Sequence, residues 1–333
     1  MNISIFETLT SHIEYWKSFI QMIFKIYKTY SNYPIVLTRV LNRKFPVESM
    51  LRNGKQVSLQ TFNAMYVVAF TQDLKHVQCD IKNDLVNISS KTIPEKTILH
   101  GAINNGDIIC GFLNEDYGKL PIKDKVVIDV GSNIGDTAIY FALHGAKKII
   151  GLEPFPKNYE LANKNIITNN LSDKIIMLLA GCSSEKRFIK IDPEYESNHE
   201  SKFIEFQHGK QIPLLTLEDI IIQYNVPFGS ILKMDCEGCE YDTISSTSEK
   251  ILKRFSHIQI EYHFGYMNLK KKLEKCGFNV IVGKPRATDV INTYIEKFNS
   301  IFSLHKNKEI HHANKKHRIG YAGFIYAIND KNI

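Results

Sequence analysis

The chain has 333 residues, 44% of them hydrophobic, which is enough for one large globular domain or two small ones. Its net charge of +7 indicates acidic partners but is too small to indicate nucleic-acid binding. No apolar run approaches the roughly 18 residues of a membrane span and no signal peptide is recognisable, so we expect a cytoplasmic location. The six cysteines are scattered, which favours reduced thiols over a disulfide framework.

The first 45 residues form an N-terminal helical segment. Within it, residues 5–30 repeat apolar side chains at helical spacing, with Trp16 and several Phe and Tyr residues on one face and lysines between them. This pattern is typical of a helix packed on its own domain, which we favour, and also of a helix lying on a membrane surface. Peripheral membrane contact through residues 5–30 is therefore an open alternative.

Residues 46–118 form a small α+β subdomain. They contain short strand-like pieces separated by Gly and Asn turns, at Gln56–Leu59, Tyr66–Phe70 and Asp107–Phe112.

From residue 119 to 333 the pattern alternates between strands and helices, which predicts an α/β domain with a doubly wound, mostly parallel sheet. The expected strands are 126–130, 148–152, 175–180, 230–235, 257–262, 278–282 and 321–327. The expected helices are 136–144, 156–168, 216–224, 240–252 and 266–276. Thr216 and Asp219 have capping-box spacing, and Gly277 suits a helix end. Residues 185–214 suggest an inserted hairpin, and residues 283–320 a long basic connection.

Residues 126–137 predict a buried strand, a glycine turn and a helix start, the arrangement of a nucleotide-type site. Glycine lets a ligand approach the backbone there. The spacing Gly131-x-x-x-Gly135 differs from the G-x-G-x-x-G of dinucleotide-binding proteins, which counts against an NAD-linked oxidoreductase. Asp129 and Asp136 also place negative charge where a pyrophosphate would sit, so a cationic or zwitterionic ligand fits better.

Glu153 ends the second strand, 22 residues after Gly131. In doubly wound sheets an acidic residue at this place accepts hydrogen bonds from ribose hydroxyls. Pro154 and Phe155 follow it, and Phe155 or a neighbour is free to flank an adenine.

The fourth strand ends in Lys233-Met-Asp-Cys-Glu-Gly-Cys-Glu240, with three carboxylates where open α/β sheets bind ligands. Lys233 and Asp235 project from one strand face. Glu237 and Glu240 also suit a helix start. The Cys236-x-x-Cys239 spacing invites a zinc or redox interpretation. No second C-x-x-C pair exists, and acidic neighbours would raise the thiol pKa values, so we disfavour both.

The fifth strand ends in Glu261-Tyr262-His263. Glu261 and His263 alternate to one face, where they could act as a base or hold Mg²⁺ beside Asp235. A histidine after a strand is often only structural. Residues 305–318 gather lysines and histidines and lie on the expected ligand face, which is compatible with an acidic group on the substrate.

With these motifs together, the chain resembles the FkbM family of S-adenosylmethionine-dependent methyltransferases. The resemblance is carried by VVIDVGSNIGDTAIYFALHGAKKIIGLEPFP (126–156), TLEDI (216–220), LKMDCEGCEYD (232–242) and IQIEYHFG (258–265). It implies the Rossmann-like class I methyltransferase fold, a seven-stranded sheet whose last strand is antiparallel. Ser132 stands where alanine is usual, and Cys236 and Cys239 where small or aliphatic residues are usual.

The resemblance also implies roles for individual residues. The methionine part of the cofactor would be surrounded by Asp129, Gly131, Asn133, Gly135 and Asp136, and Ser132 and Thr137 belong to the same turn. Glu153 would hold the ribose, with Pro154 and Phe155 beside it. Asp235 would lie near the amino group or sulfonium, and Glu237 toward the acceptor.

The implied function is methylation of a hydroxyl on a glycan, glycolipid or related metabolite. Methyl transfer needs positioning and, for an alcohol, a base, for which Glu237, Glu261 and His263 are candidates and Lys233 an auxiliary group. No resident metal is expected. The alternatives are Mg²⁺-assisted O-methylation of a small molecule, with Asp235, Glu261 and His263 as ligands, and a non-catalytic cofactor- or RNA-binding module. The oligomeric state stays open.

Overall fold

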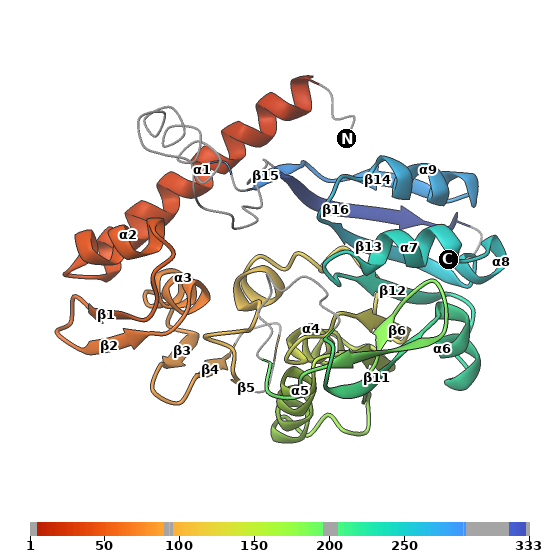
Figure 1. Cartoon of the computed structure of the whole chain (residues 1–333), viewed down its shortest axis with the longest axis horizontal. Coiled ribbons are helices and arrows are strands. Elements are labelled where there is room, and N and C mark those ends of the chain that lie inside the picture. The colour runs from red at the N-terminus through yellow and green to blue at the C-terminus, as the bar shows by residue number, and fades with distance from the viewer. Residues whose placement is uncertain are drawn as a thin grey trace.

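A sheet with seven strands in one order, and an eighth strand, β15, beside β16, forms the centre of the computed structural model (Figure 1). The structure describes residues 5–89, 93, 96–195, 206–288, 290 and 320–330. The strand order is β14-β16-β13-β12-β6-β7-β8. Their bounds are β6 Val126–Val130, β7 Lys148–Leu152, β8 Ile175–Leu178, β12 Ser230–Met234, β13 Phe255–Tyr262, β14 Asn279–Val282 and β16 Gly320–Ile328. β16 runs antiparallel to both of its neighbours, whereas β6, β7, β8, β12 and β13 are parallel. The predicted fold class is thus confirmed.

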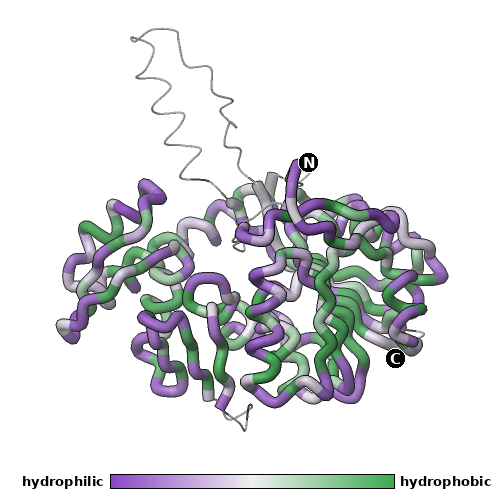
Figure 2. The backbone as a smooth tube through the Cα atoms, turned by 60° about the horizontal axis from the view of Figure 1, so that its bottom comes forward, coloured by the Kyte–Doolittle hydropathy of each residue, from purple (hydrophilic) through white to green (hydrophobic). Residues whose placement is uncertain are grey.

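Helices cover both faces of this sheet. They are α4 Asp136–Leu143, α5 Pro156–Thr168, α6 Leu217–Gln223, α7 Cys239–Ser246, α8 Glu249–Leu252 and α9 Met267–Lys275. Alternate residues of β6 enter different cores, because strand side chains alternate between faces. Val127 packs with α4 and α5, whereas Ile128 and Val130 pack with α6, α7 and α9. Figure 2 shows the resulting hydrophobic strands inside the sheet region.

The N-terminal region packs against the first of these cores. Its elements are α1 Ile5–Thr29, α2 Tyr33–Leu41, β1 Val47–Met50, β2 Gln56–Leu59, α3 Phe62–Thr71, β3 Val77–Asp80, β4 Leu85–Ile88, β5 Thr97–His100 and the π-helix η1 Ile109–Leu113. Ile26 and Tyr30 share one hydrophobic cluster with Val127 and Ile149 of the sheet. The division at residues 45 and 118 stays a prediction.

Two expected strands in this region are helical. Tyr66–Phe70 lies in α3, whose first turn is capped by the Thr61 side chain accepting from the Ala64 N–H. α3 is buried on most of its surface, so it shows no amphipathic period and resembles a buried strand in sequence. Asp107–Phe112 enters η1, whose N-cap is Ile108. The Asp107 carboxylate accepts from the Cys110 N–H, and its carbonyl accepts from the Gly111 N–H.

Two asparagines of α5 fasten the N-terminal region to the sheet domain. Asn165 and Asn169 lie one helical turn apart and pair with the open edge of β5. Their side-chain oxygens accept from the His100 and Ile98 N–H groups at 2.7 and 2.9 Å, and their amides donate to the carbonyls of the same two residues.

Smaller differences follow from turn chemistry. The helix expected at 240–252 is two helices, because the Ser248 side chain caps α8 by accepting from the Ile251 N–H. The capping box of Thr216 and Asp219 is confirmed. Gly277 follows the C-cap of α9 with a φ of 85°, as expected.

Strands β10 Arg187–Ile191 and β11 Lys210–Leu215 pair antiparallel where the hairpin is expected, and β11 also pairs with β9 Gly181–Cys182. β15 Arg286–Thr288 pairs with β16. The basic run at 305–318 lies outside the described residues. Within the described part of the chain, no helix combines the length and apolarity needed to cross a membrane.

Candidate active site

The turn after β6 lies against the segment that leaves β12. Gly131 has a φ of 78°, and a Cβ built on it would lie 1.8 Å from the carbonyl oxygen of Asp235. A Cβ on Gly135 would meet Ala162 of α5 at 3.1 Å. A side chain at either glycine would therefore disturb the packing of the chain on itself, and the expectation that a ligand's approach also needs glycine there stays a prediction. Asp235 lies beside the glycine turn, as expected.

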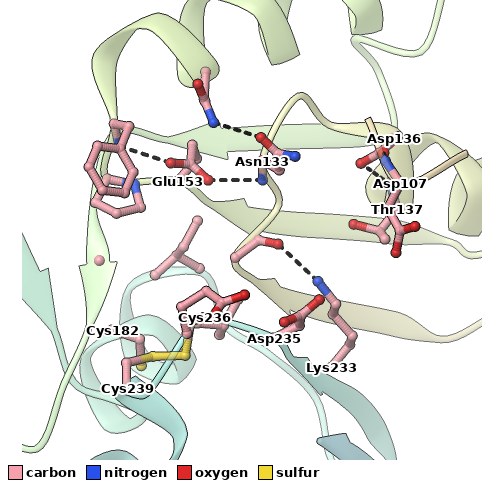
Figure 3. A pocket seen from close by; sticks show the side chains of 18 of the residues that line it. Asp107, Asn133, Asp136, Thr137, Glu153, Cys182, Lys233, Asp235, Cys236 and Cys239 are labelled. Carbon is pink, nitrogen blue, oxygen red and sulfur yellow. Dashed lines mark hydrogen bonds between the residues drawn. A yellow bond between two sulfur atoms is a disulfide. The ribbon is translucent and has the colours of Figure 1, made fainter. Parts of the chain in front are cut away.

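A pocket opens between this turn, the end of β7 and the end of β12 (Figure 3). Its empty volume, counted with the part open to solvent, is about 900 Å³, which is the size of a cofactor site. Ten of the fifteen predicted site residues line it: Gly131, Asn133, Asp136, Thr137, Glu153, Pro154, Phe155, Lys233, Asp235 and Glu237. Asp129, Ser132, Gly135, Glu261 and His263 are not among its lining residues.

Asp129 and Lys233 form a buried ion pair under the turn. The Lys233 Nζ lies 3.0 Å from Asp129 Oδ1 and donates to the Gly131 carbonyl at 2.9 Å, and both side chains are almost wholly buried. Burial lowers the pKa of Lys233, but the charges of Asp129 and Asp235 more than offset this and raise it. Thr137 donates to the other oxygen of Asp129 at 2.7 Å, and Ser132 donates to the Asp129 carbonyl. This geometry supports the turn.

Asp136 lies at the start of α4, where its carboxylate accepts from the Asp107 N–H at 2.6 Å and from the Thr137 N–H at 3.0 Å. Burial, together with the charge of Asp107, raises the pKa of Asp136 to about 7. This end of the pocket therefore holds two carboxyl groups beside the helix N-terminus.

Glu153 lies at the opposite end of the turn. Its two carboxylate oxygens accept from the N–H groups of Asn133 and Phe155, each at 2.9 Å (Figure 3). Each oxygen keeps a further lone pair for a ligand hydroxyl. Burial raises the pKa of Glu153 to about 8. Asn158 of α5 donates to the Asn133 side chain at 2.6 Å and holds the turn in place.

His263 lies among three carboxylates from the β12–α7 segment. Its Nδ1 lies 3.2 Å from Glu240 Oε1, and its Nε2 lies 3.4 Å from Glu237 Oε1 and 3.8 Å from Asp235 Oδ1. Burial lowers the pKa of His263, but the hydrogen bond to Glu240 and the charges of Glu237 and Asp235 outweigh it and raise the pKa to about 10. Without another cation present, this imidazole is protonated at neutral pH.

Glu261 is separate from this cluster. Its carboxylate lies 4.0 Å from Arg286 of β15. Burial and the charge of Asp235 raise its pKa well above the usual range. The metal-ligand set that the sequence suggested is accordingly corrected: Asp235, Glu237 and His263 gather their ligand atoms within 4.8 Å, and Glu261 is not in the group.

Cys236 and Cys239 form a disulfide, with Cα atoms 5.5 Å apart, which corrects the expectation that all six cysteines are reduced. Gly238, with a φ of 125°, lets the chain turn back so that the two thiols meet. Both residues line the pocket (Figure 3). Cys79, Cys110, Cys182 and Cys276 are free thiols.

Sequence reasoning did not predict nine of the lining residues, among them Asp107, Tyr117 and Asn158. Asn158 could have been found, because it lies in the first turn of the helix that follows Glu153. Asp107 and Tyr117 come from the segment before β6, whose helical turns the sequence pattern did not reveal.

Residues 129–280 match the family model of the methyltransferase FkbM domain. The chain is 31% identical over 134 residues to Uncharacterized protein 158B of Sulfolobus islandicus rod-shaped virus 1, covering 40% of this chain and 60% of that protein. It is 23% identical over 143 residues to the hexuronic acid methyltransferase AglP of Haloferax volcanii, covering 43% and 58%. The chain thus spans less than two thirds of the length of these relatives.

Among solved structures, a methyltransferase FkbM from Methylobacillus flagellatus is similar, with 13% sequence identity and a TM-score of 0.37. The similarity covers 63% of this chain and 45% of that one.

Proposed function

We propose that the protein transfers a methyl group from S-adenosylmethionine to an acceptor oxygen. The proposal starts from the match of residues 129–280 of this chain to the model of the methyltransferase FkbM domain. The observation that carries the proposal is the pocket with buried acidic side chains at both ends of one glycine turn, Glu153 at one end and Asp136 at the other. Such a pocket suits a nucleoside whose far end is cationic and disfavours a pyrophosphate.

The residues present fit this cofactor. Glu153 would accept from the ribose hydroxyls, and Phe155 and Cys182 supply walls for the adenine. The Asp136 end of the pocket would receive the amino-acid part. When bound, the cofactor supplies an electrophilic methyl group on its sulfonium. The chain's own work is then to position the acceptor and to keep water out.

Glu237 is the best candidate to take the acceptor's proton. It lines the pocket, and its side chain is 28% exposed, so an acceptor can reach it. Lys233 is committed to Asp129, and the raised pKa values of Glu261 and His263 disfavour both as bases at neutral pH. These catalytic roles are part of the proposal.

The acceptor class follows from weaker indications. Asp235 is followed by Cys-Glu-Gly, not by the Pro-Pro-aromatic segment of many amino-group methyltransferases, which favours oxygen as the acceptor atom. One similar protein is named as a hexuronic acid methyltransferase. We therefore propose a sugar hydroxyl of a glycan, glycolipid or related metabolite.

The test of cofactor binding is calorimetry with S-adenosylhomocysteine. Glu153→Gln should weaken binding by about ten- to 100-fold, because it puts an amide NH₂ where an oxygen would accept from the ribose hydroxyls. Glu160→Gln, at an exposed position of α5, is the matched control and should bind as the parent does. Tight NAD⁺ binding without binding of S-adenosylhomocysteine would overturn the proposal.

The test of the reaction is incubation with methyl-labelled S-adenosylmethionine and separated glycan, lipid and RNA fractions. Label should enter glycan or glycolipid, and Glu237→Gln should lower turnover by about 100-fold or more while cofactor affinity is kept. Label that enters only RNA would contradict the acceptor class.

A further inference from the structure

We propose that Asp235, Glu237 and His263 bind a divalent cation of the Mn²⁺ type. The three side chains come from the carboxyl ends of β12 and β13, which are neighbours in the sheet (Figure 1). Each offers one ligand atom, and all three atoms lie within 4.8 Å of one another. All three side chains are partly exposed, so an ion from solution can enter.

The distances within the group fit ligands around a shared ion better than direct ion pairs. The Nε2 of His263 lies 3.4 Å from Glu237 and 3.8 Å from Asp235. A charge-assisted hydrogen bond is about 2.7–2.9 Å long. Two ligand atoms that are each about 2.1 Å from one metal ion lie about 3.0–3.6 Å apart at ligand angles of 90–120°. The separation from Glu237 falls in this range, and the separation from Asp235 is slightly longer.

Glu240 supplies a second and independent feature. It is fully buried, and its Oε1 lies 3.2 Å from the Nδ1 of His263, which turns Nε2 toward Asp235 and Glu237. Its other oxygen accepts from the Gly238 N–H at 2.9 Å, so the carboxylate itself is held. A buried carboxylate on the far nitrogen is the usual support of a metal-ligating histidine.

The local charge also calls for a cation. Three acidic side chains, Asp235, Glu237 and Glu240, lie around the His263 imidazole, and the nearby Lys233 is paired with Asp129. The disulfide occupies the two sulfur atoms of Cys236 and Cys239, which could otherwise form a softer site with Glu240. One nitrogen and two carboxylate oxygens favour a hard or borderline ion, and Mn²⁺ accepts both donor types.

The role of the ion rests on the proposed function. Because Asp235 and Glu237 line the pocket, a cation bound to them could hold the acceptor oxygen and lower the pKa of its hydroxyl. A carboxylate that binds through one oxygen leaves its second oxygen free for the acceptor's proton. The cation site itself can be tested without any methyl transfer.

The test is titration of the purified full chain with Mn²⁺ alone, followed by the loss of the free-ion electron paramagnetic resonance signal. We expect one saturable site per chain. Glu237→Gln and His263→Gln should each weaken it at least tenfold. Glu240→Gln should weaken Mn²⁺ binding by about ten- to 100-fold, because Glu240 holds the His263 ring in place and is not itself a ligand of the ion. Asp242→Asn, an exposed carboxylate of α7, is the matched control and should leave it unchanged.

Melting curves recorded without metal show whether each variant is folded. Binding that persists in folded Glu237→Gln and His263→Gln, or no saturable binding to the parent chain, would overturn the site. Failure of the proposed function looks different: the Mn²⁺ titration would succeed while S-adenosylhomocysteine gave no heat.

We propose, on a separate observation, that α1 lies on an anionic lipid surface. Its outer face, as we call it, consists of seven large side chains that are 42–74% exposed: Phe6, Leu9, Ile13, Trp16, Ile20, Phe24 and Tyr27. Steps of three and four residues put them along one side of the helix, over about 32 Å. The opposite side, with Met22 and Ile26, is buried in the core.

The composition of the outer face identifies its partner. Lys17 and Lys28 lie along one border of it. The Lys17 Nζ is paired with Glu14 at 2.9 Å, and the Lys28 Nζ lies 4.5 Å from the Phe24 ring centre. Aromatic side chains bordered by lysine are typical of helices that lie in a lipid interface. A seam with a second copy of α1 would favour Leu, Ile and Val at these positions instead.

The test is co-sedimentation with vesicles of phosphatidylcholine, with and without phosphatidylglycerol. The chain should bind the anionic vesicles, and Trp16→Ser combined with Ile20→Ser should weaken binding at least tenfold. Ile222→Ser, at a residue of α6 that is 67% exposed, is the control and should not. No vesicle binding, or a dimer in light scattering that the double variant abolishes, would contradict the lipid proposal.

Discussion

Asp129 and Lys233 show how a residue's role depends on a partner about 100 positions away. Sequence reasoning predicted a cofactor contact for the first and a catalytic role for the second. The two lie opposite each other on neighbouring strands β6 and β12 and neutralise one another in the interior. Removing one partner of such a buried pair is strongly destabilising. Their functional roles stay predictions, while their mutual contact is a fact of the fold.

Glu153 supplies a prediction at the residue scale. Its pKa is about 8 in the folded protein against 4.5 for an ordinary glutamate. Between these values the folded state binds more protons than the unfolded state, so the ligand-free protein should lose stability as pH rises from about 4.5 to 8. Glu153→Gln removes this cost. It should therefore raise the melting temperature at pH 8.5 but change it little at pH 5, as measured by scanning fluorimetry.

The exposed position Glu160 again provides the control, since Glu160→Gln should follow the parent chain at both pH values. Equal pH dependence in the parent and in Glu153→Gln would mean that Glu153 is ionised in the ligand-free pocket.

At the scale of elements, the short segment between β12 and α7 carries several of the candidate site residues. Within five residues it supplies Asp235 and Glu237 to the pocket, the disulfide between Cys236 and Cys239, and a helix start. Glu237 itself has a φ of 57°, which is unusual for a side-chain-bearing residue. The covalent bridge across this turn limits how far the two carboxylates can move apart.

The bridge leads to a direct prediction. Protein purified without reductant and unfolded in guanidinium should show four reactive thiols per chain, since two of its six cysteines are joined. Cys236→Ser should raise the count to five, because Cys239 is then released. Cys276→Ser should lower it to three. A count of six in the parent chain would contradict the disulfide.

At the scale of the whole molecule, one hydrophobic cluster joins the N-terminal region to the sheet. It runs from Ile26 and Tyr30 through Val68 to Val127 and Ile149. Because apolar burial is shared across the junction, the two regions should unfold together. The hydrogen bonds between the asparagines of α5 and the backbone of β5 also favour joint unfolding of the two regions.

We therefore expect one calorimetric transition for the full chain. Ile26→Ala, at a fully buried position of α1, should cost about 2–5 kcal/mol and lower that whole transition without splitting it. Ile222→Ala, at an exposed position, is the control. Two separate transitions would instead make the expected division near residue 118 an independent folding boundary.

The sequence by itself determined the sheet class and the location of the pocket. Strand period, helix period and the spacing of Gly131, Glu153 and Asp235 are local signals, so the fold class was predicted correctly and ten of the fifteen candidate residues line one cavity. The capping box at Thr216 was likewise readable, because its two hydrogen bonds join residues three apart.

Only the tertiary structure decided which side chains meet. The sequence pattern of α3 predicts a strand, and only the structure shows that α3 is a helix buried on most sides. The sequence pattern also did not predict the disulfide between Cys236 and Cys239. The contacts of Lys233 with Asp129 and of His263 with Glu240 join residues 23 or more positions apart. Such contacts depend on how strands and helices pack, which local patterns do not encode.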